Sequence, residues 1–271
     1  MFWVNGRSQT HISLGDRSFQ YGDGCFTTIL TKQGQLVYWQ EHIERMEACL
    51  AVLQIPFPDW CQVLSWAKHA ALSDGLAGLK IHISRGSGGR GYSPAGVDGP
   101  VVTISNFVFP AHYAAWQKQG VELGVCATRL GIQPVLAGHK HNNRIEQVLA
   151  KAEVDGSGFA DAVTLNVQNH VIETTMANLF WVKNSKVYTP ELNLSGVAGV
   201  MRRKVLEFLR SQNINVVVDA FGLSELLDAD EVWMCNSLLG VAPVMSITAP
   251  NNQILFPIGK LTQRLQGNLN K

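Results

Sequence analysis

Short strand-like segments dominate this 271-residue chain, and helical segments do not alternate with them one for one. Helices are predicted at 41–53, 60–72, 143–154 and 199–211 from apolar residues spaced three and four apart. A hairpin is predicted around 33–35, and strands at 79–84, 101–107, 121–127, 162–165, 170–172, 178–182, 215–219 and 231–235. A doubly wound sheet would need strict alternation of strands and helices, so the pattern favours an α+β fold.

Residues 110–119 are predicted to form a linker that contains a helix. We therefore expect a smaller N-terminal α/β domain at 1–108, a linker at 109–119 and a larger C-terminal domain at 120–271, which would carry Lys140. Hydrophobic residues make up 46% of the chain, enough for a sizeable core. Charged residues make up only 16%, below the usual quarter or so. The small charged surface favours a homo-oligomer.

Charge and hydropathy exclude several classes of protein. The net charge is +1 with no run of five like charges, so binding to nucleic acid or to an anionic membrane surface is not expected. The sequence has no apolar stretch of about 18 residues and no signal peptide, which favours a cytoplasmic protein. The five cysteines are odd in number and widely spaced, so we predict reduced thiols rather than disulfides or a zinc site, and no bound metal.

One lysine lies in a polar loop just before a predicted helix. Lys140 has His139 and His141 on either side, and Arg144 follows. Neighbouring cations or burial lower the pKa of a lysine, and the free amine is then a nucleophile or a base. The alternative is an ordinary solvated lysine.

A glutamate and a glycine-rich turn are further candidates. Glu173 ends a predicted strand, and an ionised carboxylate there could keep a pyridine nitrogen protonated; the alternative is an ordinary strand-end glutamate. Gly196 and Gly199 precede a predicted helix that begins near Val200 and Met201, and helix N-termini bind phosphate groups. A plain surface loop would show the same pattern.

Three more side chains could bind anions. Arg45 lies beside Ile43 and Met46 on a predicted helix and could reach a buried anion, although pairing with Glu41 is the alternative. Arg90 and Tyr92 lie in the glycine-rich segment 85–99 and could hold a substrate carboxylate. That segment contains a bare G-x-G-x-x-G pattern, but no strand–helix–strand context for a dinucleotide site accompanies it.

Taken in order along the chain, these pieces form a specific pattern. The segments 19–26, 42–46 and 173–180, together with Lys140 and 199–201, resemble the fold-type IV pyridoxal-phosphate (PLP) enzymes, which include branched-chain and D-amino-acid aminotransferases. Within that group, the segments 26–28, 84–93, 138–144 and 235–237 resemble the bacterial 4-amino-4-deoxychorismate lyases. The aminotransferases usually have an acidic residue where this chain has Thr27.

The resemblance implies a two-domain α+β fold of the D-amino-acid aminotransferase type, a homodimer, and PLP bound between the domains. It implies that Lys140 is the Schiff-base lysine and that Thr28 and Glu173 are the other catalytic residues. The implied cofactor-binding residues are Arg45, Lys140, Glu173, Asn178, Val200, Met201, Asn236 and Ser237. The implied substrate-binding residues are Phe26, Arg90 and Tyr92.

The implied reaction is the conversion of 4-amino-4-deoxychorismate to 4-aminobenzoate and pyruvate, a step of folate biosynthesis. Two alternatives stay open at the level of sequence. One is a PLP-dependent aminotransferase that acts on D-amino or branched-chain amino acids, and the other is a PLP-binding protein without catalytic activity.

Overall fold

The computed structural model describes residues 1–250 and 252–270, which form two compact units. The first unit comprises Met1–Phe109 together with His139–Asn143. The second comprises Pro110–Gly138 and the residues from Arg144 onward. Each unit combines a large sheet with helices, so the prediction of an α+β fold is confirmed.

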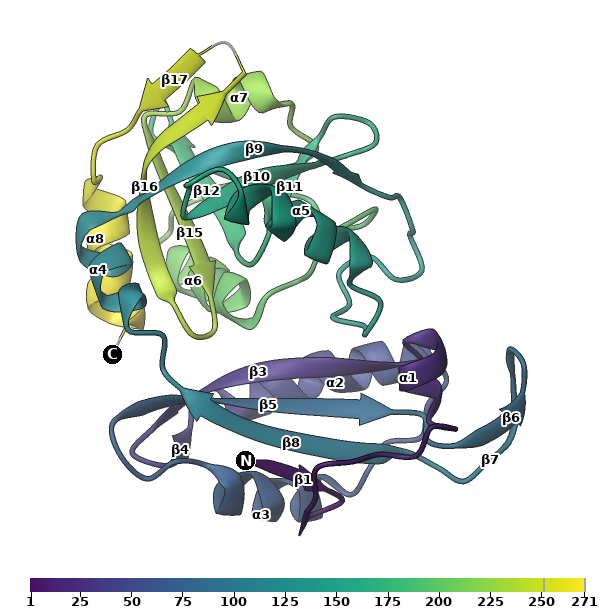
Figure 1. Cartoon of the computed structure of the whole chain (residues 1–271). Coiled ribbons are helices and arrows are strands. Elements are labelled where there is room, and N and C mark those ends of the chain that lie inside the picture. The colour runs from purple at the N-terminus through teal and green to yellow at the C-terminus, as the bar shows by residue number, and fades with distance from the viewer. Residues whose placement is uncertain (251, 271) are drawn as a thin grey trace. The chain divides into compact units, whose positions relative to one another are not determined.

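The first unit is built on a six-stranded sheet with the strand order β2-β1-β8-β5-β3-β4 (Figure 1). Its strands are β1 (Phe2–Val4), β2 (Arg7–Ser8), β3 (Gly24–Lys32), β4 (Gln35–Leu36), β5 (Leu76–Ser84) and β8 (Val101–Val108). Between β5 and β8 the chain forms a separate two-stranded hairpin of β6 (Gly88–Arg90) and β7 (Ser93–Val97). The helices are α1 (Arg17–Tyr21), α2 (Trp39–Val52) and α3 (Trp60–Ala70).

Alternation along β3 separates the core of this unit from its open face. Cys25, Thr27 and Ile29 are buried, whereas Phe26 and Thr28 are only half-buried, because successive side chains of a strand point to opposite faces. Helices α2 and α3 cover the buried face with a core that includes Met46, Leu50, Val63, Ala67, Leu79, Ile81 and Ile104. The opposite face of β3 is therefore the one that presents Phe26 and Thr28.

The segment around Lys140 belongs to the first unit, although the sequence analysis counted it with the C-terminal part. The Phe26 N–H donates to the Lys140 carbonyl at 3.0 Å, and the Asn142 N–H donates to the Gly24 carbonyl at 2.9 Å. The cause lies in the sheet. Strand β4 pairs only with Thr31 and Lys32 at the far end of β3, which leaves the edge at the start of β3 to be paired by residues 139–143.

The second unit contains a nine-stranded sheet with the order β11-β10-β9-β16-β15-β12-β13-β14, and β17 pairs with β16. Its strands are β9 (Val121–Leu130), β10 (Asp161–Asn166), β11 (Val171–Thr174), β12 (Asn178–Lys183), β13 (Lys186–Pro190), β14 (Val216–Asp219), β15 (Glu231–Asn236), β16 (Gly240–Ala249) and β17 (Asn252–Leu255). Its helices are α4 (His112–Gln119), α5 (Ile145–Asp155), α6 (Val200–Ser211), α7 (Leu223–Leu227) and α8 (Lys260–Leu269).

Most of the predicted helices and strands are present to within a few residues. The sequence analysis missed β1, β2, α1, the β6–β7 hairpin, β13, α7, β16, β17 and α8. Helix α1 is short and buries only Arg17, so it has no apolar stripe to detect. Strand β16 contains Pro243, a residue that argues against a strand in an interior position. Among the helices of the described residues, none combines the length and the apolar character needed to cross a membrane.

Candidate active site

Lys140 and Phe26 lie together on the first unit. The Lys140 Nζ is 4.6 Å from the centroid of the Phe26 ring, a geometry in which the ring face attracts the ammonium. The Nζ of Lys80, on β5, lies at the same distance of 4.6 Å from that ring. Thr28 pairs with Lys80 across the sheet and shares the open face with Phe26. Sequence reasoning missed Lys80, because its position depends on the register between β3 and β5.

Arg45 is tied to the core of the same unit through a side chain that the sequence analysis did not assign to the site. The Arg45 Nη2 donates to the Thr27 hydroxyl at 2.6 Å. The Thr27 Oγ1 also lies 2.6 Å from His42 Nδ1. Both Thr27 and His42 are fully buried, while Arg45 is half-buried at the edge of the core. The Arg45 guanidinium is therefore part of a buried polar network.

The donors of this network can be assigned from its chemistry. Arginine can only donate, so the Thr27 oxygen accepts from Arg45. The hydroxyl hydrogen of Thr27 then has His42 Nδ1 as its acceptor, which puts the imidazole proton on Nε2. Burial and the positive charges of Arg45 and Lys140 hold the pKa of His42 well below its ordinary value. His42 is thus a neutral acceptor that fixes Thr27, which in turn fixes Arg45.

In the second unit, Glu173 is buried near the end of β11, and its carboxylate makes two specific hydrogen bonds. Its Oε2 accepts from the Val197 N–H at 3.1 Å and from Asn178 Nδ2 at 3.3 Å. Asn178 also donates to the Val197 carbonyl at 2.9 Å. Hydrogen bonds from N–H donors favour the ionised form of a carboxylate. The arrangement therefore presents a fixed carboxylate that suits a protonated ring nitrogen.

Asn178 also connects Glu173 to the start of helix α6. A Cβ atom on Gly199 would collide with the Asn178 side-chain oxygen, so the close approach requires glycine. Gly199 is the N-cap of α6 and offers no side chain to its N–H groups. The first-turn N–H groups, including those of Val200 and Met201, have no acceptor within the helix. Together with the helix dipole they suit a phosphate group.

Asn236 is the last residue of β15, and Ser237 lies in the turn that leads to β16. The Asn236 Oδ1 accepts from the N–H groups of Leu238 and Leu239 at 2.9 and 2.8 Å. Its Nδ2 donates to the Met176 carbonyl at 3.3 Å. The Asn236 amide therefore shapes the turn that carries the half-buried Ser237. A direct contact of either residue with a cofactor stays a prediction.

Arg90 and Tyr92 lie on the β6–β7 hairpin, an element separate from the strand that carries Phe26 and Thr28. Both are exposed, and Tyr92 has 88% of its surface accessible. The Tyr92 ring contacts Tyr21 of α1, with 5.6 Å between centroids. In the parts of the chain that the structure describes, no group of three histidine, cysteine or acidic side chains is placed to hold a metal ion.

The two sets of residues match the parts of PLP by chemistry. In the first unit, the Lys140 amine suits an aldehyde and the Arg45 guanidinium suits a phosphate. In the second unit, the buried Glu173 carboxylate suits a protonated ring nitrogen, and the helix N-terminus at Val200 and Met201 suits a phosphate. The buried Glu173 carboxylate, which accepts from the Val197 N–H and from Asn178, is the observation that best fits such a cofactor.

Comparison with known proteins identifies the family. The profile of the amino-transferase class IV family matches residues 24–247. A Vibrio harveyi aminodeoxychorismate lyase is 78% identical over 270 residues, which cover 100% of both chains. A Bacillus subtilis aminodeoxychorismate lyase is 30% identical, over 93% of this chain and 88% of that protein.

A solved structure agrees with the sequence comparisons. The crystal structure of 4-amino-4-deoxychorismate lyase from Pseudomonas aeruginosa matches with a TM-score of 0.91 and 37% identity. The match covers 98% of this chain and 97% of that one. On these grounds the chain belongs to the amino-transferase class IV family and, within it, to the aminodeoxychorismate lyases.

Proposed function

We propose that this chain is a PLP-dependent lyase that converts 4-amino-4-deoxychorismate to 4-aminobenzoate and pyruvate, the reaction used in folate biosynthesis. The observation that carries the proposal is the 78% identity to a lyase along the full length of both chains. A shared fold alone would not separate lyases from aminotransferases. Identity at this level over the whole chain does.

The proposed cofactor-binding residues are those that the resemblance implies. Arg45, fixed by Thr27, would bind the phosphate with the N–H groups of Val200 and Met201. Glu173, fixed by Val197 and Asn178, would accept the N–H of the pyridine ring. When bound, PLP supplies an electron sink for the carbon that carries the substrate amine.

Lys140 would carry the proton transfers of the elimination. Its amine takes the C4 proton of the substrate as a general base. The neighbouring bond from C3 to the ether oxygen then breaks, the enolpyruvyl group leaves and takes up a proton to become pyruvate, and the ring becomes aromatic. Thr28, which shares the open face of β3 with Phe26, would hydrogen-bond the lysine or relay its proton. Arg90 and Tyr92 would anchor a carboxylate, a charge-assisted contact worth about 1.5–3 kcal/mol.

A product assay tests the proposal. The PLP-loaded protein is incubated with enzymically prepared 4-amino-4-deoxychorismate, and 4-aminobenzoate and pyruvate are measured separately. Equal amounts of both products, and none with the Lys140→Ala variant, would support the lyase. Exchange of amine between an amino acid and a keto acid without 4-aminobenzoate would show an aminotransferase instead. If neither reaction occurs, the protein binds PLP without catalysis and the proposal fails.

We further propose that the protein is a cytoplasmic homodimer. Helix α5 exposes Ile145, Val148 and Leu149 by 67%, 59% and 54%. They are spaced as i, i+3 and i+4 and therefore share one face, and a contiguous exposed apolar face suits contact with another protein. All five cysteines are free thiols, in keeping with a reducing compartment. Light scattering should give twice the chain mass, and Val148→Asp should lower it; cell fractionation checks the compartment.

A further inference from the structure

The β6–β7 hairpin has little packing of its own. Its residues from Gly88 to Gly96 are exposed, and Gly88, Gly89, Gly91 and Gly96 have left-handed backbone angles. Such a segment loses much conformational freedom when it becomes ordered. Its defined shape must therefore come from contacts with the rest of the unit.

Arg17 of α1 supplies those contacts. It is only 4% exposed, and it donates to three successive carbonyls of the hairpin turn. Its Nη1 bonds the Gly91 and Ser93 carbonyls at 3.0 and 3.2 Å, and its Nη2 bonds the Tyr92 carbonyl at 3.1 Å. The Arg17 backbone N–H also donates to the Gly86 carbonyl at 2.9 Å, near the base of the hairpin. One buried side chain thus holds the tip of an exposed loop.

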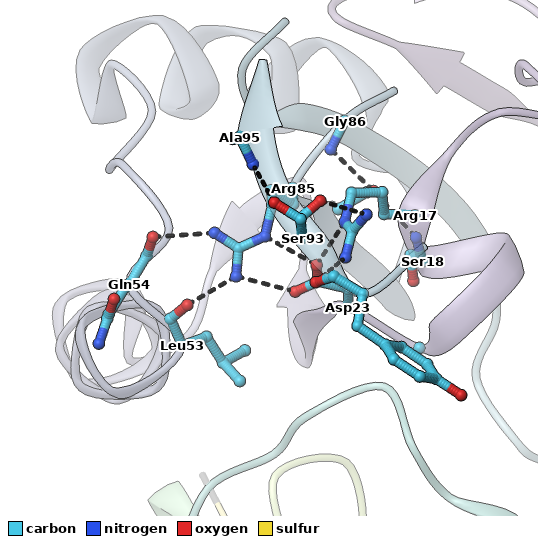
Figure 2. Close-up of polar contacts among 12 residues, drawn as sticks. Arg17, Ser18, Asp23, Leu53, Gln54, Arg85, Gly86, Ser93 and Ala95 are labelled. Atoms are coloured by element: carbon cyan, nitrogen blue, oxygen red, sulfur yellow. Dashed lines mark hydrogen bonds and ion pairs between the residues drawn. The ribbon is translucent and has the colours of Figure 1, made fainter. Parts of the chain in front are cut away.

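Asp23 fixes Arg17 in turn (Figure 2). The Asp23 carboxylate accepts from Arg17 Nε at 2.9 Å and from Arg85 Nε at 2.7 Å. Arg85 also donates to the Leu53 and Gln54 carbonyls at the end of α2, at 2.6 and 2.9 Å. Burial alone would raise the pKa of Asp23, but the hydrogen bonds from Arg85 and Arg17 outweigh it and hold the pKa below its ordinary value.

The contacts by which Arg17 holds the 91–93 turn, which we call the clamp, extend to the two side chains that were predicted to bind substrate. Arg90 and Tyr92 flank Gly91, whose carbonyl is the first of the three that Arg17 holds. The Arg17 guanidinium lies 5.0 Å from the centre of the Tyr21 ring, and Tyr21 contacts Tyr92. Arg17 therefore positions the Tyr92 backbone directly and the Tyr92 ring through Tyr21.

We propose that Arg17 is a positioning residue for substrate binding, which acts by holding the 91–93 turn so that Arg90 and Tyr92 meet a carboxylate of the substrate. The inference rests on the proposed lyase function. With the clamp in place, the substrate binds a turn that is already ordered. Without it, the turn and both side chains must become ordered when the substrate binds, and this cost lowers the affinity for the substrate.

The first test is a kinetic comparison of Arg17→Met with wild type and with Arg7→Met, an exposed arginine of β2 as the matched control. The free-energy cost of ordering two side chains on binding corresponds to about a tenfold rise in KM for Arg17→Met. The kcat and the PLP dissociation constant should stay near the wild-type values, as should all parameters of Arg7→Met. An unchanged KM, or an equal loss of PLP binding, would overturn the inference.

A double-mutant cycle separates the clamp from a general structural role. Arg90→Ala combined with Tyr92→Ala should raise KM, and adding Arg17→Met to that pair should raise it little further, because Arg17 acts through these two side chains. If the rises in KM caused by the substitutions multiply, the proposal is contradicted. If Arg17→Met fails to fold, Asp23→Asn gives the same comparison by loosening Arg17.

A physical readout keeps the inference distinct from the proposed function. Amide hydrogen exchange in residues 88–97 should be faster in Arg17→Met than in wild type, whether or not substrate is turned over. Equal exchange would contradict the clamp. If wild type forms no 4-aminobenzoate while exchange still rises, the lyase proposal fails and the clamp itself stands.

Discussion

Replacing Thr27 with valine would remove one hydroxyl from a buried network while keeping the shape of the side chain. The hydroxyl accepts from Arg45 and contacts His42, each at 2.6 Å, with no exposure of Thr27 to solvent. A hydrogen bond to a charged group contributes about 1.5–3 kcal/mol, and a buried imidazole left without its partner adds to the loss. We therefore expect Thr27→Val to lower the free energy of unfolding of the apoprotein by about 2–3 kcal/mol.

The same substitution should weaken PLP binding, because the guanidinium proposed to hold the phosphate loses its support. A loss of about 1.4 kcal/mol in that contact corresponds to a tenfold rise in the PLP dissociation constant. Denaturant unfolding of the apoprotein and a titration with PLP, followed by absorbance, measure the two effects separately. Thr27→Ser retains the hydroxyl and should restore most of both.

Thr31→Val is the matched control. Thr31 lies four residues along the same strand, is 1% exposed, and within the described residues its hydroxyl has no hydrogen-bond partner. Removing that hydroxyl should be neutral or slightly stabilising, since a buried unpaired polar group is unfavourable. If Thr27→Val unfolds like Thr31→Val and binds PLP like wild type, the network does not hold Arg45 and the reasoning is refuted.

Three further predictions concern single residues. Lys140→Ala should abolish 4-aminobenzoate formation with an unfolding curve like that of wild type; full activity in this variant would remove the mechanism. Glu173→Gln should still bind PLP but slow the elimination strongly, by about a hundredfold as for loss of one electrostatic group, and an unchanged rate in stopped-flow assays would argue against its role. Burial and the charge of Lys80 lower the pKa of His82 from 6.5 to about 4. The unfolded chain therefore binds one more proton than the folded chain between these two pH values. The free energy of unfolding should fall on acidification from pH 6.5 to about 4, by at most about 1.4 kcal/mol per pH unit. His82→Gln should flatten that slope, and an unchanged slope in the variant would contradict this role of His82.

Much of the fold was predictable because its signals are local. The helix that carries Arg45 and the helix that begins near Val200 both show apolar residues at helical spacing, and the structure has them as α2 and α6. The order of the motifs along the chain indicated the family, which the comparisons confirm. The roles of Lys140 and Glu173 came with that resemblance and stay predictions.

What escaped the sequence depends on contacts between distant segments. Thr27 meets Arg45 only because α2 packs over β3 at one particular register, and nothing local to Thr27 reveals it. Lys80 comes near Phe26 through strand pairing. Arg17 lies some 74 residues before the turn it holds, in a helix too short to show a periodic pattern.

The central claim is that the amine of Lys140 bonds the aldehyde of PLP. Reduction of the PLP-loaded protein with borohydride makes such a bond permanent, and peptide mass spectrometry then locates the labelled lysine. The account predicts one phosphopyridoxyl group per chain, on Lys140. A label on Lys80 or on any other lysine, or no label at all on a protein that retains PLP and full activity, would contradict it.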